Sequence, residues 1–453
     1  MSDYTEFLKR KIRKHVDTGF QVDPRTLPTQ LFPFQRDIVT WALKRGRAAI
    51  FAQTGLGKSF MESAWAKAVH EHTGKNVIIL APLAVAAQMV REAKKFGIPA
   101  KQCSDQTDVI PGITVTNYEK LHKFDLSQFV GVVLDESSIL KSFDGKTRTM
   151  LIDACKDVPF RLCATATPAP NDFTELGNHS EFLGVMSVHG MQAVFFAHDA
   201  SDTGTWRLRG HAEDAFWEWM CSWSVLIRRP SDLGYDDGAY DLPPLNTYEH
   251  VVNVEGEIAK TLSERLKARR NSLDARVAKA ASLTPKEGHF VWWCNLNDEA
   301  EALCKAIPGA VEIRGSDKEE EKGRKLNAFS NGEIRVLVTK AKIAGFGMNW
   351  QHCNNTGFVG MNDSFEQCYQ AIRRFWRFGQ DNEVNVHYVV ANTEAEVMEN
   401  IKRKEAEAER MGAAMVAKMS DISSAEIRSA SNTKDVYNPT VPVKVPAWIK
   451  VGY

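Results

Sequence analysis

Residues 52–59 read Ala52-Gln53-Thr54-Gly55-Leu56-Gly57-Lys58-Ser59, and this octapeptide decides the fold of the chain. It follows an apolar run at residues 48–52 and precedes a stretch with helical spacing at residues 61–72. A glycine-rich turn between a buried strand and a helix is the setting of a phosphate-binding loop. Gly55 and Gly57 allow backbone N–H groups to turn toward phosphate oxygens, where a side chain would block them. We therefore predict a nucleotide-binding loop.

Each residue type in this loop suits a contact with a nucleotide. The Lys58 ammonium would reach the β- and γ-phosphates, and the Ser59 hydroxyl would ligate Mg²⁺. The helix that begins there adds the positive end of its dipole. Ala52 stands where the strict pattern has glycine, so a plain glycine-rich turn stays open as the alternative on this evidence alone. The predicted nucleotide-binding residues of the loop are Ala52, Gln53, Thr54, Gly55, Leu56, Gly57, Lys58 and Ser59.

An acidic pair, Asp135-Glu136, ends the apolar run at residues 131–134 and is followed by Ser137-Ser138. Ligands bind at the carboxyl ends of strands in open α/β sheets. Asp135 would hold Mg²⁺, and Glu136 would orient or deprotonate the attacking water. A solvated turn is the alternative, and the catalytic interpretation depends on the order and distance of the pair after the phosphate loop.

The chain alternates between short apolar runs and longer amphipathic stretches over residues 31–183 and again over residues 242–412. Such alternation indicates a parallel sheet covered on both faces, so we predict an α/β fold with two such domains. The expected strands cover residues 48–52, 77–81, 113–116, 131–134 and 161–164 in the first domain, and residues 289–294, 310–313, 335–339, 354–359 and 385–390 in the second.

Three further segments flank or separate these domains. Residues 1–30 form a basic N-terminal segment, and residues 184–241 are rich in aromatic side chains and predict a small helical insertion. Residues 413–453 are rich in Ser, Thr, Asn and Pro, which predicts an extended or partly disordered tail.

Composition limits the functional classes. The length of 453 residues suits two to three domains. Lys plus Arg and Asp plus Glu number 57 each, so a nucleic-acid partner would need a local basic groove. The eight cysteines form no C-x-x-C pair, which indicates neither a zinc site nor a disulfide framework. Without a signal peptide or a membrane-spanning run, we expect a cytoplasmic protein that does not bind membranes.

With the loop and the acidic pair placed, the chain resembles the superfamily-two helicases, specifically their Swi/Snf-like branch, over residues 31–404. Residues 31–35, Leu-Phe-Pro-Phe-Gln, are similar to the segment that reads adenine, with Gln35 as the adenine contact. Residues 165–176 are similar to the T-x-T-P-x-x-N-x-x-x-E-L coupling motif, which separates this branch from most other helicases. The resemblance assigns coupling to Thr165, Ala166 and Thr167 and nucleic-acid contacts to Pro82, Thr116, Asn117 and Tyr118.

The second domain carries the remaining family motifs. Residues 227–230 and 241–244 resemble the passage into the second motor domain. Residues 339–349 resemble motif five, which implies a nucleic-acid contact at Thr339 and a nucleotide contact at Gly347. Residues 370–380 resemble motif six, Q-A-x-x-R-x-x-R-x-G-Q, and include Gln370. Arg374 and Arg377 lie three apart, so on a helix they would share one face and could neutralise charge on the γ-phosphoryl group.

This resemblance implies two tandem RecA-like domains with ATP and Mg²⁺ in the cleft between them. It implies an ATP hydrolase that moves along DNA, with duplex favoured, single strands possible and RNA less expected. An RNA helicase, a strand-separating helicase and a non-hydrolysing scaffold with a motor fold stay open as alternatives. The compact layout resembles stripped-down helicases of phages and prophages, which suggests a role in phage DNA replication, recombination or repair. The acidic motif D-E-S-S and Arg373 depart from the commoner family pattern.

Overall fold

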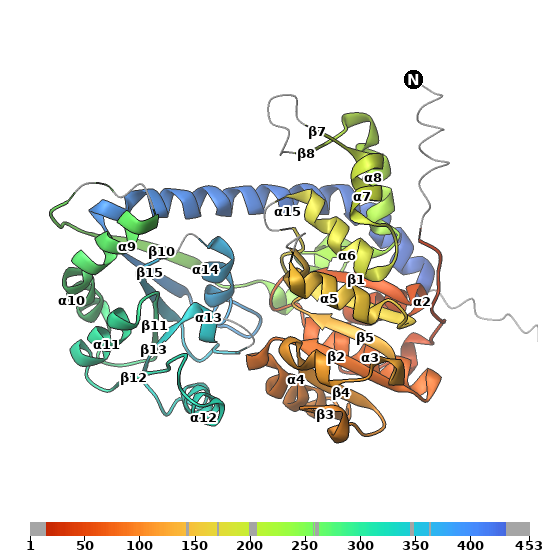
Figure 1. Ribbon diagram of the computed structural model, residues 1–453, viewed down its shortest axis with the longest axis horizontal. Helices are drawn as coiled ribbons and strands as arrows, with labels where there is room; N and C mark the ends of the chain where they lie inside the picture. The colour runs from red at the N-terminus through yellow and green to blue at the C-terminus, as the bar shows by residue number, and fades with distance from the viewer. Residues whose placement is uncertain are drawn as a thin grey trace, which may run out of the picture.

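The computed structural model describes residues 15–141, 145–169, 172–198, 206–256, 258, 262–344, 348–361 and 364–431. Two α/β lobes lie side by side, and the long helix α15 (Ala395–Ser431) runs along both of them (Figure 1). This helix packs on α2 (Pro33–Arg45), α8 (Glu213–Cys221) and β9 (Ser224–Ile227) of the first lobe and on α14 (Phe365–Ile372) of the second. No helix within the described ranges is long and apolar enough to cross a membrane.

The first lobe is built on a parallel sheet with the strand order β3-β4-β2-β5-β6-β1-β9. Its five predicted strands are present. The strands are β1 (Arg47–Ala52), β2 (Asn76–Ala81), β3 (Ala100–Gln102), β4 (Ile113–Asn117), β5 (Phe129–Asp135), β6 (Phe160–Thr165) and β9 (Ser224–Ile227). The helices are α2 (Pro33–Arg45), α3 (Lys58–Thr73), α4 (Leu83–Lys95), α5 (Lys146–Cys155) and α6 (Leu176–Leu183).

The second lobe holds another parallel sheet, with the strand order β10-β15-β14-β11-β13-β12. The prediction of two α/β units with parallel sheets is thus confirmed. The strands are β10 (Leu245–Val252), β11 (Phe290–Cys294), β12 (Ala310–Glu312), β13 (Val336–Lys340), β14 (Asn355–Val359) and β15 (Val384–Ala391). The helices are α9 (Leu262–Asn271), α10 (Leu273–Leu283), α11 (Asn297–Ala306), α12 (Glu319–Ser330), α13 (Ala341–Ala344) and α14 (Phe365–Ile372).

Three sequence motifs meet at one edge of the first sheet because their strands are neighbours in the order β5-β6-β1. Asp135 at the end of β5 pairs with Ala164, and Thr165 at the end of β6 pairs with Phe51. β5 is buried at every position, as expected of a central strand covered on both faces. The phosphate loop, the acidic pair and the coupling motif therefore start from adjacent strand ends.

The insertion at residues 184–241 is only partly helical, which corrects the sequence prediction. It contains α7 (Val188–Phe195) and α8 (Glu213–Cys221), but also the hairpin of β7 (Phe196–His198) and β8 (Trp206–Leu208). Strand β9 then joins the first sheet beside β1, and all its residues are buried. A buried apolar run this short has no periodicity that separates strand from helix, which explains the error.

The prediction of an extended segment from residue 413 is wrong as far as Ser431, because α15 continues to that residue. Met415, Met419 and Ile427 lie four and eight residues apart on one helix face and are buried against the first lobe. Burial of this stripe outweighs the polar composition of the segment. The rest of the tail, residues 432–453, and the basic residues between Lys9 and Lys14 lie outside the described residues.

Candidate functional site

A cavity of about 430 Å³ lies between the two lobes at the phosphate loop. Both halves of the predicted site line it. The first lobe contributes Gln35, Thr54, Gly55, Gly57, Lys58, Ser59, Asp135 and Glu136, and the second contributes Asn349, Gln351, Arg374, Arg377 and Phe378. The predicted motifs of the two domains, which are more than 200 residues apart in the sequence, thus face one shared space.

The phosphate loop has a backbone that requires glycine at two positions. Gly55 and Gly57 have φ angles of 98° and 79°, a region that other residues rarely adopt. A Cβ atom on Gly57 would lie 2.4 Å from Nε2 of Gln35. Helix α3 begins at Lys58, so its N-terminal N–H groups lie at the cavity. The Lys58 Nζ donates to the Ala52 carbonyl at 2.9 Å, and this bond would yield to a phosphate oxygen.

The acidic pair lies opposite this lysine at the end of β5. Burial, followed by the charge of Glu136, raises the pKa of Asp135 to about 7. Glu62 of α3 is fully buried beside it, and burial and the charge of Asp135 raise the pKa of Glu62 well above its ordinary range. The Ser59 hydroxyl and the Asp135 carboxylate are the hard oxygen donors that Mg²⁺ prefers, so this donor set fits the predicted ion.

Glu136 has a strained backbone and a contact with the coupling motif. Its φ angle of 53° is the only positive value of a non-glycine residue in the described part of the chain. The Thr165 hydroxyl donates to its Oε2 at 3.3 Å, and the N–H of Thr167 donates to Thr165 Oγ1 at 3.2 Å. The predicted coupling residues Thr165, Ala166 and Thr167 therefore lie directly beside the predicted catalytic carboxylate.

Arg374 is held rigidly at the cavity wall of the second lobe. Its guanidinium donates to the backbone oxygen of Gln370 at 3.0 Å, to Gln370 Oε1 at 3.2 Å and to the Met348 carbonyl at 3.3 Å. Burial, followed by the neighbouring charge of Arg377, lowers the pKa of Arg374 to about 9, while Glu136 and Asp135 act in the opposite direction. Gln370 therefore positions this arginine.

Arg377 faces the phosphate loop from the same segment. A Cβ atom on Gly55 would lie 3.6 Å from the Arg377 Cβ, so the loop and this arginine are in near contact across the cavity. Helix α14 ends at Ile372, so the two arginines occupy the turn after it and do not share a continuous helix face as the spacing suggested. Their side chains nevertheless line the same cavity.

Side-chain contacts join the two lobes, and the contact between Asn349 and Glu92 lies in the wall of this cavity. Asn349, the last residue of motif five, donates through Nδ2 to Glu92 Oε1 of α4 at 2.8 Å. Gln53 of the phosphate loop donates through Nε2 to the Tyr369 hydroxyl at 3.2 Å. Lys141 and Glu366 form an ion pair between the lobes. The sequence analysis assigned no role to Glu92 or Asn349. Their contact forms only when the two lobes come together, and no local sequence pattern predicts such a contact.

The predicted adenine contact, Gln35, lies at the end of the cavity that is rich in aromatic rings. Its Oε1 accepts from the N–H of Phe32 at 3.0 Å. Its Nε2 donates to the Leu56 carbonyl at 2.9 Å and to the Tyr240 hydroxyl at 3.3 Å. Tyr240 and Phe378 also line this cavity, and the sequence analysis did not identify either of them.

The residues that the family resemblance assigned to nucleic acid are mostly interior. Tyr118 is buried and donates to the Asp135 carbonyl at 2.6 Å, and the Thr339 hydroxyl donates to the Ile313 carbonyl at 3.2 Å. Thr116 and Asn117 are also buried, whereas Pro82, which precedes α4, is half-buried. In this arrangement the four buried side chains do not reach solvent, and nucleic-acid contact by these residues stays a prediction. Gly347 lies outside the described residues.

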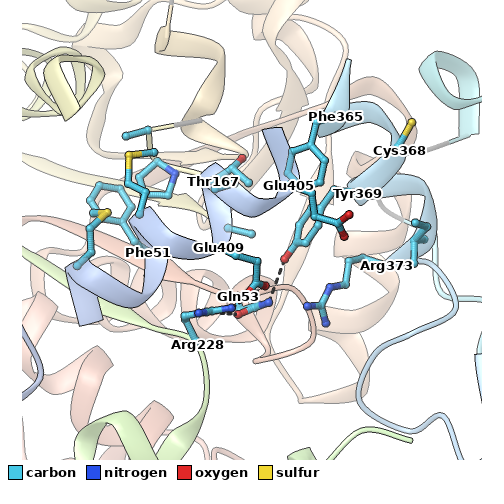
Figure 2. A pocket seen from close by; sticks show the side chains of 18 of the residues that line it. Phe51, Gln53, Thr167, Arg228, Phe365, Cys368, Tyr369, Arg373, Glu405 and Glu409 are labelled. Atoms are coloured by element: carbon cyan, nitrogen blue, oxygen red, sulfur yellow. Dashed lines mark hydrogen bonds and ion pairs between the residues drawn. The ribbon is translucent and has the colours of Figure 1, made fainter. Parts of the chain in front are cut away.

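A second, mainly apolar cavity of about 150 Å³ lies between the lobes and beneath α15 (Figure 2). Gln53 of the phosphate loop reaches its wall, where Arg228 Nε donates to Gln53 Oε1 at 3.4 Å. Arg228 also forms an ion pair with Glu409 of α15 at 2.9 Å. Thr167 of the coupling motif lines the same space. The phosphate loop is thus connected through one arginine to the helix that runs along both lobes.

Comparisons with known proteins match both lobes. Residues 32–176 match the DEAD/DEAH box helicase family, and residues 277–379 match the helicase conserved C-terminal domain. The mouse (Mus musculus) protein "DNA annealing helicase and endonuclease ZRANB3" is 23% identical over 424 residues, which are 82% of this chain and 39% of the relative. The cattle (Bos taurus) protein of the same name is 23% identical over 432 residues, with the same coverage. The chain therefore spans about two fifths of the length of these relatives.

One solved structure with a similar chain is described as "Sulfolobus solfataricus SWI2/SNF2 ATPase core in complex with dsDNA". The alignment covers 91% of this chain and 99% of that chain, with 17% sequence identity and a TM-score of 0.42.

Proposed function

We propose that this chain, a superfamily-two helicase by its two matched domains, hydrolyses ATP between its lobes and uses the hydrolysis to move along DNA. The observation that carries the proposal is the shared cavity. Lys58, Asp135 and Glu136 line it from the first lobe, and Arg374 and Arg377 line it from the second. Groups from both lobes facing one space are what an ATPase needs if hydrolysis is to change the arrangement of the lobes.

Each of these groups has a defined task in the proposed reaction. Lys58 and the loop N–H groups bind the β- and γ-phosphates, and Ser59 and Asp135 hold Mg²⁺. Mg²⁺ supplies neutralisation of the phosphate charge when it is bound. Glu136 orients the attacking water and accepts its proton. Arg374 and Arg377 stabilise the charge that develops on the transferred phosphoryl group, and Gln370 keeps Arg374 in place.

The contact between Glu136 and Thr165 supports coupling of hydrolysis to motion. When ATP is hydrolysed, the charge around Glu136 changes, and this alters the hydrogen bond that Glu136 accepts from Thr165. The coupling motif also lines the second cavity between the lobes, so a shift of the motif would reach both lobes. ATP binding draws the lobes together through the arginines, and product release lets them part. A nucleic-acid strand held by both lobes would advance in each such cycle.

DNA as the track is supported by the curated relatives, which are described as DNA annealing helicases. Within the superfamily we assign the chain to the Swi/Snf-like branch, supported by the T-x-T-P sequence at residues 165–168. This assignment favours duplex DNA without strand separation. We further propose action in the cytoplasm of a bacterium or a phage-infected cell, supported by the seven buried free cysteines. A role in phage DNA replication, recombination or repair is proposed on the family resemblance of the sequence alone.

The discriminating experiment measures ATP turnover with duplex DNA, single-stranded DNA and RNA in separate reactions. We expect duplex DNA to stimulate turnover most. Triplex displacement without fork unwinding would then identify a translocase, and fork unwinding would identify a strand-separating helicase. Equal or greater stimulation by RNA would identify an RNA motor. If turnover with every nucleic acid equals the background of a protein-free control, the proposed function is refuted. The chain would then be a non-hydrolysing binding scaffold.

A further inference from the structure

Glu92 lies on α4 at the wall of the nucleotide cavity, where one side chain from each lobe donates to it. Gln88 Nε2 of the same helix donates to Glu92 Oε1 at 2.7 Å, and Asn349 Nδ2 of the second lobe donates to the same oxygen at 2.8 Å. All three side chains line the cavity. Gln88 and Glu92 are four residues apart, so they share one face of the helix. The Glu92 carboxylate is thus held on its own lobe and bonded to the other.

The charge of Glu92 determines how the two amides are oriented. Within the described part of the chain, Gln88 Oε1 and Asn349 Oδ1 are buried and have no hydrogen-bond partner. Both amides therefore direct their nitrogen atoms toward the carboxylate and leave their oxygen atoms unsatisfied, which costs free energy. Hydrogen bonds to a charged acceptor are stronger than those between neutral groups, and this difference explains the orientation of both amides.

Asn349 lies between two residues that are bonded to Arg374. The Met348 carbonyl accepts from the Arg374 guanidinium at 3.3 Å. The N–H of Trp350 donates to the backbone oxygen of Arg374 at 2.9 Å. A bond that fixes Asn349 therefore also fixes the segment that carries Arg374, both at its backbone and at its side chain.

Glu92 also balances the charge of Arg377, which lines the same cavity. Burial lowers the pKa of Arg377, and the charge of Glu92 acts in the opposite direction. For Arg374 the carboxylates that act in this way are Glu136 and Asp135. The two arginines are thus balanced by different carboxylates of the first lobe, and Glu92 belongs to neither the phosphate loop nor the acidic pair.

We propose that Glu92 is a positioning residue for the two arginines, which it aligns with the phosphate loop through its bond to Asn349. This inference rests on the proposed function, because it concerns the arginines that stabilise the transferred phosphoryl group. Lys58 and the phosphate loop belong to the first lobe and keep their relative positions when the bond is lost. Loss of the bond therefore slows the chemical step and leaves nucleotide binding nearly unchanged.

The test exchanges the acidic and the amide side chain between the lobes. Glu92→Ala removes the acceptor, and Asn349→Asp places two carboxylates in contact. The double variant, Glu92→Gln with Asn349→Asp, restores a donor and an acceptor and keeps the total charge, with the positions of the two groups exchanged. Glu71→Ala is the matched control, because Glu71 lies on α3 outside the cavity and forms an ion pair with Lys67.

We expect Glu92→Ala and Asn349→Asp each to lower kcat for ATP about ten- to a hundredfold, as the loss of a hydrogen bond to a charged group does. KM for ATP should stay within about threefold of wild type, because the bond acts on the chemical step. The double variant should recover kcat to within about threefold of wild type. Glu71→Ala should match wild type in both constants.

Unchanged kcat in both single variants would overturn the proposal. A double variant as slow as the single variants would also overturn it, because the two side chains would then act separately. Amide hydrogen exchange at Trp350 is a second readout that does not depend on hydrolysis, and it should be faster in the single variants and restored in the double variant. If the wild-type chain hydrolyses no ATP, the proposed function fails, and the exchange rates still decide for or against positioning by Glu92.

Discussion

Lys58, Glu62 and Asp135 are buried close together at the start of α3 and the end of β5. Burial raises the pKa values of both carboxyl groups, whereas Lys58 lowers them. Two buried carboxyl groups with one lysine leave the site short of positive charge, which either a proton or a bound cation can supply. A divalent ion between Ser59 and Asp135 would supply that charge, which agrees with the oxygen donors present there.

Substitution of Glu136 by glutamine removes the group that accepts the proton of the attacking water. We expect Glu136→Gln to lower ATP turnover about 10²- to 10⁴-fold while nucleotide binding persists. Lys58→Ala should lower both turnover and binding, because the lysine contacts the phosphates themselves. Phosphate release and nucleotide binding measured on the same preparations check both statements. Wild-type turnover in either variant would be inconsistent with these roles.

His179 of α6 introduces a dependence of stability on pH. It is fully buried, lies 3.2 Å from Ser137 Oγ and packs on Phe51, and burial lowers its pKa from 6.5 to about 4. The unfolded chain therefore binds this proton more readily than the folded one. Its contribution to stability is present above about pH 6.5 and is lost as pH falls toward about 4.

Between pH 7 and pH 5 we expect this histidine to reduce the free energy of unfolding by about 2 kcal/mol. Denaturant unfolding of wild type and His179→Gln at the two pH values measures the difference. The variant starts from lower stability but should lose less of it on acidification. Parallel losses in the two proteins would show that His179 does not titrate as described.

Helix α15 is the element that relates the two lobes. Val397, Met398 and Ile401 belong to the core of the second lobe, and Met415 and Met419 belong to a core of the first. Arg228 and Glu409 add an ion pair beside the second cavity. One helix thus buries apolar side chains in both lobes and contacts the arginine that bonds to Gln53.

Shortening a buried side chain of α15 tests this arrangement. We expect Met419→Ala to lower the free energy of unfolding of the first lobe by about 2–5 kcal/mol, because it leaves a cavity in the core. Arg403→Ala, at an exposed position of the same helix, should stay within about 0.5 kcal/mol of wild type. Denaturant titration of both variants provides the comparison, and an unchanged midpoint for Met419→Ala would mean that the helix is not docked in solution.

At the scale of the whole molecule, the sequence predicted those site residues whose positions depend only on their neighbours in the chain. Gly55 and Gly57 are required by a backbone turn, and Asp135 follows an apolar strand, so residue type and order predict their positions. Tyr240, Phe378 and Glu92 line the cavity only because the two lobes come together. The residues next to them in the sequence carry no pattern that predicts this contact. Strand β9 and the end of α15 were misassigned because burial against distant segments outweighed their local composition.

All the proposed roles require that the two lobes face each other across one nucleotide. It is tested most directly by ATP binding and single-turnover hydrolysis in wild type and in Arg374→Ala, a variant of the second lobe only. We predict that Arg374→Ala binds ATP nearly as wild type does but hydrolyses it about 10³-fold or more slowly. Hydrolysis at the wild-type rate in Arg374→Ala, and also in Arg377→Ala, would contradict the account.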